Sequence, residues 1–377
     1  MKITHLLKSA YRTVVPIGIR KRVWEARNKE VPINSLANIV TNGKLDVISI
    51  ISHTPSPYFV VLDKKNDPVS CMLREGIPFN DTLLTESFKL VKDGVFLDLG
   101  ANIGAFSLYM AANGWKGYSF EASLANTNLL RKSAFINDFD IKIIDKIISD
   151  HTGNLLFYDN SIYGFVINDA CVFDSLDNRD EHRVIELPCI ALDDMPELAD
   201  LQKVDLVKMD IEGSEAAALR GMSRLLSRLG YPPIYMEVNA WTLFLMGETP
   251  YSLMKTASDI GYTAYTFEDV NTVCEFVLES FPTLVLRDII LIKDLPDHFR
   301  VVINEARQDN DADIDWILRK LIDRKNWEHH DVYIIYTLRD YPQYYNNPII
   351  KQALSEIADS ESNDILTEMA IGWFKAI

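Results

Sequence analysis

The stretch VFLDLGANIGAFSLYMA, residues 95–111, decides the fold of this chain. Its first five residues form an apolar run of strand length, and the residues from 104 onward are typical of a buried helix. The turn between them carries Gly100 and Gly104, and glycine permits the positive backbone angles of a tight connection. In doubly wound α/β sheets, ligands bind beyond the carboxyl ends of strands, at turns of this kind. The stretch therefore predicts a ligand-binding turn.

The residues of this turn favour a cationic ligand over a dinucleotide. The pattern G-x-G-x-x-G of dinucleotide folds needs a glycine where this chain has Asn102, whose side chain would crowd a pyrophosphate. Asp98, which follows three apolar residues of the strand, would repel a diphosphate but suits an ammonium and a sulfonium. The turn thus predicts S-adenosylmethionine as the ligand. An NAD-dependent oxidoreductase of Rossmann type is the alternative.

Two later strand ends carry further candidate cofactor contacts. Glu121 ends the run YSFEA, about 20 residues beyond the glycine turn, where a carboxylate can accept the hydroxyl hydrogens of a ribose. Ser149 and Asp150 follow the run IKIIDKII, where an adenine amino group could be met. Ser-Asp-His-Thr-Gly is also an ordinary turn sequence, so both interpretations of residues 149–153 stay open.

A second group of acids follows two more predicted strands. Asp210 ends the strand in DLVKMDIEGSE, Glu212 lies in the turn that follows, and Glu237 ends the strand in IYMEVN. Because parallel strands end at one edge of a sheet, we expect these three carboxylates to face one cleft, with one of them as general base. Capping of its own helix by Glu212 and pairing of Glu237 with Lys208 are the structural alternatives. An oxygen-only cluster would suit Mg²⁺, but we expect no metal.

The order of the predicted elements indicates an α/β fold with a mostly parallel, seven-stranded sheet covered by helices on both faces. Apolar strand runs alternate with helical patterns, and the last two strands suggest an antiparallel edge. The expected strands are 95–99, 118–122, 141–148, 204–210, 233–238, 262–267 and 286–293, with short β runs at 154–158, 163–167 and 184–190. The expected helices between them are 81–92, 104–113, 123–136, 214–228 and 250–260.

The two ends of the chain differ from this central part. Residues 1–75 predict an N-terminal extension with a basic helix and a β-hairpin at 58–73, and residues 76–295 form the α/β domain. Residues 296–377 predict a helical appendage with helices at 298–308, 312–325, 328–338, 348–358 and 363–375. The basic, partly apolar residues 1–28 predict either a solvated helix that packs on the main domain or a segment in peripheral contact with an anionic membrane. The C-terminal helices suggest a protein partner or self-association.

Composition excludes several classes of function. The 377 residues carry a net charge of −16, which argues against a nucleic-acid partner because phosphate binding needs a basic surface. The four cysteines are far apart and form no CxxC pair, so they predict neither a zinc site nor a disulfide framework and fit a reducing cytoplasm. No apolar run has the length of a signal-peptide core or a membrane span.

These motifs resemble the FkbM family of methyltransferases. The matching pieces appear in order over roughly residues 80–293: FLDLGANIGAFSLYMA, SFEAS, IISDHTG, CIALDDM, VDLVKMDIEGSEAAALRG and IYMEVN, with Asn126 and Asn137 in the second helix. D-x-G-A-N-x-G followed by K-x-D-x-E-G-x-E is a fairly specific combination. The chain departs from the family at Ala122, where Glu-Pro is common, and at Asn239, where many relatives carry histidine. A histidine base is therefore absent from that position.

The resemblance implies a Rossmann-like class I methyltransferase fold and S-adenosylmethionine as methyl donor. It also implies O-methylation of a hydroxyl on a sugar, a glycan under biosynthesis or a natural product. Carried over by position, the cofactor would be held by Asp98, Gly100, Asn102, Gly104 and Glu121. Asp210, Glu212 and Glu237 would line the reaction centre. A non-catalytic interaction protein built on a methyltransferase fold is the remaining alternative.

Overall fold

The computed structural model describes the central α/β part of the chain and pieces of both ends. The described residues are 45–50, 57–63, 68–75, 84, 93–159, 164–167, 183–278, 286–302, 310–322 and 338–358. The predicted basic helix in residues 1–28, most of the helix predicted at 81–92, and the helices predicted at 328–338 and 363–375 lie outside these residues.

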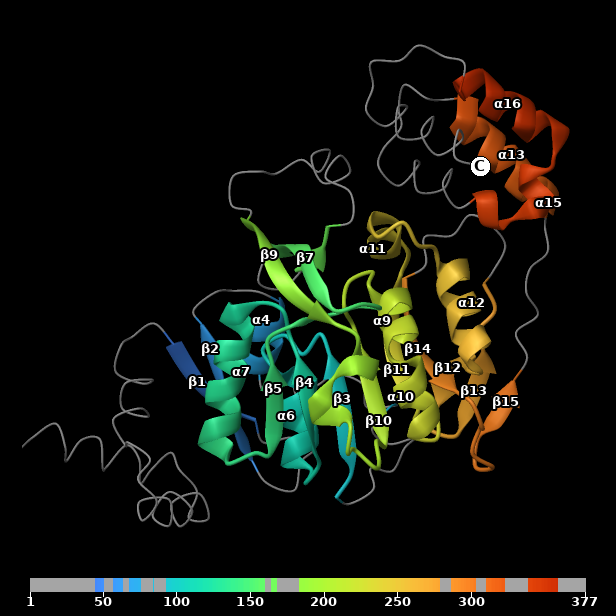
Figure 1. The fold of residues 1–377 in the computed structure, drawn as a ribbon. Coiled ribbons are helices and arrows are strands. Elements are labelled where there is room, and N and C mark those ends of the chain that lie inside the picture. The colour runs from blue at the N-terminus through green and yellow to red at the C-terminus, as the bar shows by residue number, and fades with distance from the viewer. Residues whose placement is uncertain are drawn as a thin grey trace, which may run out of the picture.

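The largest feature is a mixed sheet in which nine strands are described, two more than the sequence predicts (Figure 1). Five neighbouring strands run parallel, and β14 is antiparallel to both of its neighbours, so the predicted antiparallel edge is present. The two additional strands, β13 and β15, continue the sheet beyond β12. In spatial order the strands are β15 (Arg300–Val302), β13 (Thr272–Glu275), β12 (Thr263–Asp269), β14 (Leu286–Ile292), β11 (Ile234–Asn239), β10 (Leu206–Met209), β3 (Val95–Leu99), β4 (Lys116–Phe120) and β5 (Ile141–Ile144).

Helices cover both faces of this sheet because its strands are apolar on both sides. On one face, alternate residues of the strands pack against α9 (Glu215–Gly221), α10 (Ser223–Arg228) and α12 (Pro250–Ile260). On the other face, Phe96 and Tyr235 pack with Phe106 and Met110 of α6 (Ala105–Ala112). The strand order changes direction at β3, whose neighbours are β4 and β10, and this switch point places a crevice at the carboxyl ends of the two central strands.

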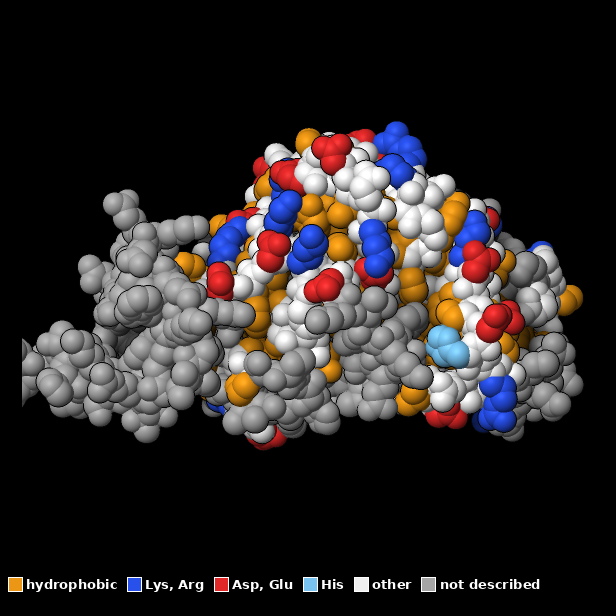
Figure 2. Space-filling model, turned by 90° about the horizontal axis from the view of Figure 1, so that it is seen from below, with side chains coloured by type: hydrophobic (Ala, Val, Ile, Leu, Met, Phe, Trp, Pro, Cys, Tyr) orange, Lys and Arg blue, Asp and Glu red, His pale blue; other side chains and the backbone are white. Residues whose placement is uncertain are grey.

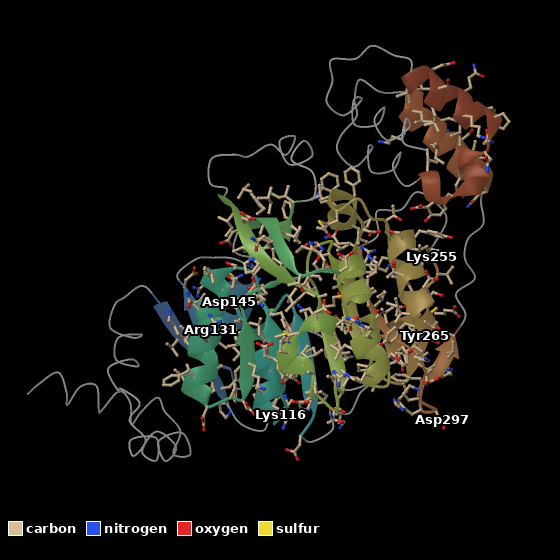
Figure 3. All side chains as sticks on the ribbon, viewed as in Figure 1. Lys116, Arg131, Asp145, Lys255, Tyr265 and Asp297 are labelled. Carbon is tan, nitrogen blue, oxygen red and sulfur yellow. The ribbon has the colours of Figure 1, made fainter. Side chains whose placement is uncertain are left out.

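A second, smaller sheet lies beside the carboxyl ends of the main one (Figure 1). Its described strands, in the order β6-β9-β7-β8, are β6 (Ile147–Ile148), β9 (Arg183–Ile190), β7 (Gly153–Asp159) and β8 (Phe165–Val166). The single strand predicted at 141–148 is therefore wrong, because β5 and β6 belong to different sheets. The chain leaves the main sheet at Asp145, which forms an ion pair of 2.6 Å with Arg131 of α7 (Leu124–Asn137), as Figure 3 shows.

The predicted hairpin at 58–73 is only half right. Residues 58–63 form β2 (Tyr58–Asp63), but its antiparallel partner is the earlier β1 (Leu45–Ile50), and residues 68–74 form the helix α4 (Pro68–Arg74). Pro68 begins that helix, a position proline favours because its missing N–H is unneeded there. The edge of β2 pairs with side chains of α7: Asn137 accepts from the Phe59 N–H at 2.8 Å, and Ser133 accepts from the Val61 N–H at 2.8 Å.

The described C-terminal part is partly helical, but the helix predicted at 298–308 is wrong for its residues 300–302. Residues 300–302, predicted inside a helix, form the edge strand β15, where β-branched Val301 and Val302 pair in parallel with β13. The following helices include the predicted 348–358 and much of 312–325. Those described are α13 (Asn310–Ile322), the 3-10 turn η4 (Leu338–Asp340), α15 (Pro342–Tyr345) and α16 (Pro348–Ala358). Thr249, the N-cap of α12, donates to Asp340 Oδ2 at 2.5 Å and so ties η4 to the α/β part.

The remaining features of the fold are the side chains on its surface and the hydropathy of its helices. Seen from below, the described part of the face opposite the second sheet carries acidic and basic side chains interspersed among apolar ones (Figure 2). Among the described residues, no helix is long and apolar enough to cross a membrane.

Candidate active site

A cavity of about 420 Å³ opens at the switch point, beside the carboxyl ends of β3, β4, β10 and β11. This is a volume typical of small-molecule sites. Its described lining carries five carboxyl groups, those of Glu121, Asp210, Glu212, Glu237 and Asp288, against two lysines. Apolar walls complete it, including Phe106, Phe120, Ile147, Ile148, Phe157 and Val166. The arrangement favours a ligand with an apolar body and a positively charged end.

The glycine turn after β3 packs closely against neighbouring segments of the chain. Gly100 has φ +80°, and a Cβ at this position would overlap the carbonyl oxygen of Asp210. Gly104 has φ +96°, and a Cβ there would overlap the Leu130 side chain of α7. Gly100 and Asn102 line the cavity, whereas Gly104 is absent from its lining and is the N-cap of α6. Asn102 adopts φ 52° and accepts a hydrogen bond from the Ile103 N–H through its own side chain at 2.7 Å.

Glu121 stands between two turns and faces the cavity. Its Oε2 accepts from the Asn102 N–H and its Oε1 from the Ser123 N–H, both at 2.8 Å. Burial raises the pKa of Glu121 to about 7, although both backbone donors, Asn126 and Lys208 lower it. With two backbone donors and the Asn126 side chain already interacting with it, the fixed carboxylate has room to accept a further hydrogen bond from a ligand.

Asp98 is fully buried and absent from the cavity lining. Its Oδ2 accepts from Ser107 Oγ at 2.5 Å, and its Oδ1 lies 3.8 Å from the ammonium of Lys208. Burial raises the pKa of Asp98, and Lys208 and Ser107 counteract that effect. Asp98 therefore does not contact the cavity, whereas its neighbour Lys208 lines it.

The turn after β10 brings Asp210 and Glu212 to the opening of the cavity. The Asp210 side chain is 41% exposed and accepts from Lys208 Nζ at 3.1 Å. Glu212 has the left-handed φ of 50°, and burial, together with the charges of Asp210 and Glu237, raises its pKa to about 7. Glu215 braces the turn from behind: its Oε1 accepts from the N–H groups of Ile211 and Gly213.

Glu237 lies on the next strand and faces the same opening. It is paired in register with Asp288 of β14, and both residues line the cavity. Burial raises the pKa of Glu237 to about 7, and the charges of Asp210 and Asp288 contribute. The structure thus places Asp210, Glu212 and Glu237 at one cavity, as we expect from the sequence.

Ser149 and Asp150 do not line this cavity, although Ile148, the residue before them, does. Ser149 is 4% exposed, and its main chain packs against Gly221 of α9. Asp150 takes part in a surface network, with Arg220 at 3.2 Å and His151 at 2.9 Å. Ser149 and Asp150 therefore make structural contacts within the protein.

Two site residues, Glu215 and Asp288, were missed in the sequence, and Lys208 was considered with a different acid. The sequence suggested an ion pair of Lys208 with Glu237 as one alternative, whereas the structure pairs Lys208 with Asp210 and Asp98. Glu215 follows E-G-S at the start of a helix, a place where a carboxylate meets free N–H groups. Asp288 left no signal, because only the register of β14 against β11 places it beside Glu237.

No group of three or more His, Cys, Asp or Glu residues in the described part of the chain is arranged to hold a metal ion.

The main sheet has β14 antiparallel beside β11 and a crevice at β3. This arrangement is that of the Rossmann-like class I methyltransferase fold. A family model then makes the assignment more specific. Residues 98–262, the central part of the chain, match the family model of the methyltransferase FkbM domain. The match covers the β3 turn, the β4 end, both acidic turns and α12.

Comparison with solved structures gives distant likenesses. A TehB-like SAM-dependent methyltransferase from Corynebacterium glutamicum is 11% identical, with 60% of this chain and 94% of that chain covered and a TM-score of 0.34. A T. thermophilus 16S rRNA N2 G1207 methyltransferase, in complex with AdoMet and guanosine, is 15% identical, with 67% and 51% covered and a TM-score of 0.35. Precorrin-6y C5,15-methyltransferase from Geobacter metallireducens is 13% identical, with 56% and 86% covered and a TM-score of 0.29. At these scores the likenesses say nothing about substrate. No curated protein matches the chain.

Proposed function

We propose that this protein is an S-adenosylmethionine-dependent methyltransferase that methylates a hydroxyl group of a sugar, a glycan or a natural product. The observation that carries the proposal is the acidic cavity at the switch point of an FkbM methyltransferase domain. Its five lining carboxyl groups against two lysines suit a ligand that carries a cationic ammonium and a cationic sulfonium. The same excess of acids disfavours a dinucleotide, whose pyrophosphate would meet like charge.

The cofactor side of the cavity is assigned to the turns after β3 and β4. Glu121, held by two backbone N–H groups and the Asn126 side chain, would accept a hydrogen bond from a ribose hydroxyl. The chain at Gly100 and Asn102 lines the cavity where the amino acid end would lie. Asp98 and Gly104 contribute by shaping this turn from inside the fold. Ser149 and Asp150 would fix the position of the loop beyond β6, rather than contact the adenine directly.

The acceptor side is assigned to Asp210, Glu212 and Glu237. When bound, the cofactor supplies an electrophilic methyl group; the protein has to align a hydroxyl oxygen with it and remove the hydroxyl proton. Asp210 is the most exposed of the acids in contact with Lys208, and the ammonium stabilises its carboxylate. We assign to Asp210 the hydrogen bond that orients the acceptor hydroxyl and takes its proton, with Glu212 and Glu237 accepting from neighbouring hydroxyls. Alignment can contribute as much as roughly 7–11 kcal/mol to such a reaction.

Calorimetry with S-adenosylhomocysteine tests the cofactor assignment. The well-folded protein should release or absorb heat in a saturable, one-to-one titration, and NAD⁺ should give none. Absence of binding of S-adenosylhomocysteine would refute the proposed function.

A second experiment tests the role of Asp210. Labelled S-adenosylmethionine is incubated with a panel of hydroxyl-bearing sugars, glycans and natural products, and transfer of the label is measured. Asp210→Asn should abolish transfer while the affinity for S-adenosylhomocysteine changes by no more than several-fold. An active Asp210→Asn variant would remove Asp210 from the mechanism.

Partners and location are proposals that rest on sequence alone. We propose a cytoplasmic protein whose residues 1–28 touch an anionic membrane surface and whose C-terminal helices bind a protein partner or a second copy. The membrane contact is tested by pelleting the protein with anionic liposomes, with and without residues 1–28. Unchanged pelleting would contradict it.

A further inference from the structure

The short helix α4 forms part of the wall of the cavity, although it precedes the residues 98–262 that match the family model. Val69 and Met72 lie three residues apart, so they share one face of this helix. Both side chains are half-buried, and both line the cavity. The site therefore includes a segment of the N-terminal part of the chain.

Packing holds α4 against the glycine turn after β3. Leu73 is fully buried in one apolar cluster with Ala101 and Ile103 of that turn. At the end of the helix, Arg74 Nη2 donates to the carbonyl oxygen of Asp63, the last residue of β2, at 2.5 Å. Two side chains of α7 in turn accept hydrogen bonds from β2, so the position of α4 is set by the folded core.

The neighbours of Val69 and Met72 indicate which part of a ligand these side chains meet. Both pack against the apolar cluster that contains Ala101, and Ala101 lines the cavity between Gly100 and Asn102. The amino acid end of the methyl donor is assigned to this same turn. Two methylene groups join that end to the sulfur, and methylene groups gain free energy when an apolar surface removes them from water.

We propose that α4 belongs to the methyl-donor site, where Met72 and Val69 pack on the two methylene groups between the sulfur of S-adenosylmethionine and its amino acid end. The flexible thioether chain of Met72 adapts to an irregular apolar surface of this kind. The contact limits the movement of the sulfur relative to the acceptor hydroxyl. This inference rests on the proposed function, because it takes the ligand to be S-adenosylmethionine.

The test compares, by calorimetry, two ligands that differ only at the amino acid end. S-adenosylhomocysteine carries the whole chain, whereas methylthioadenosine keeps the adenosine and the sulfur but ends in a methyl group. Met72→Ala should weaken the binding of S-adenosylhomocysteine about tenfold, because it withdraws about two methylene-sized groups from the ligand. The affinity for methylthioadenosine should change by less than about threefold, since this ligand lacks the chain that Met72 covers.

Three further variants make the comparison specific. Val69→Ala should weaken the binding of S-adenosylhomocysteine about fourfold, since it withdraws about one such group. Met72→Leu keeps a similar apolar volume and should bind within about twofold of the wild type. Cys71→Ala is the matched control: Cys71 is half-buried on the same helix but does not line the cavity, so both affinities should stay unchanged.

Urea unfolding checks that each variant is folded, because Val69 and Met72 also pack against the apolar cluster. An equal loss of affinity for both ligands in folded Met72→Ala would place α4 away from the amino acid end and overturn the proposal. Unchanged binding of S-adenosylhomocysteine in that variant would overturn it too. If Met72→Ala does not fold, Val69→Ala decides by the same comparison of the two ligands. Failure of the wild type to bind either ligand would instead refute the proposed function.

Discussion

Replacement of Gly100 by alanine tests whether the glycine turn is held by the neighbouring strand end. Gly100 has φ +80°, and its N–H donates to the Phe120 carbonyl oxygen at 2.9 Å, so its backbone is fixed. An added Cβ would overlap the main-chain oxygen of Asp210, which cannot move without separating β3 from β10. The change thus perturbs the contact between the two turns of the site.

Gly230 provides the matched control. Its φ is +76°, nearly the same, but no atom lies within 4 Å of an added Cβ. Both variants carry the cost of an L-residue in the left-handed region, about 1–2 kcal/mol. Gly100→Ala carries in addition an overpacking cost of about 1–3 kcal/mol, and we expect the upper end because the opposing atom is backbone.

The measurement is the free energy of unfolding by urea, with near-UV circular dichroism as the probe. Gly100→Ala should lose about 3 kcal/mol more than Gly230→Ala, without any ligand present. Equal stabilities of the two variants would refute the reasoning and would mean that the glycine serves only to clear space for a ligand.

Two further changes probe groups away from the ligand. Burial raises the pKa of Glu215 to about 8 from 4.5, so the folded state holds this proton more tightly than the unfolded state. The stabilisation it gives is complete below about pH 4.5 and is lost as pH rises to about 8. Glu215→Gln keeps an oxygen acceptor but does not titrate. Between these two pH values the wild type should therefore lose unfolding free energy relative to Glu215→Gln, by at most about 1.4 kcal/mol per pH unit. Parallel pH profiles of the two proteins would contradict this. Asn137→Ala removes the amide that pairs with Phe59 and should cost about 1–3 kcal/mol, whereas Asn128→Ala, exposed on the same helix, should stay within about 0.5 kcal/mol. Equal urea unfolding curves for the two asparagine variants would exclude the anchoring role of Asn137.

The sequence by itself was sufficient for the fold class and for most of the acidic residues of the site. Local signals carry this information: an apolar run, a glycine turn and a helical period lie within about 15 residues of one another. Asp210, Glu212 and Glu237 could be placed at one edge because parallel strands all end there. The helix at 250–260 was also predicted correctly, since Thr249, Pro250 and Gly261 mark its ends.

Only the tertiary structure decided the partners of these residues. The sequence predicts Asp98 as a ligand contact, yet its side chain is buried against Ser107 and Lys208, because it points to the face of the sheet that α6 covers. The pairing of β2 with β1, the strand at 300–302 and the register of Asp288 beside Glu237 all depend on segments far apart in the chain. Such contacts are set by packing and register, which leave no periodic mark on the residues that make them.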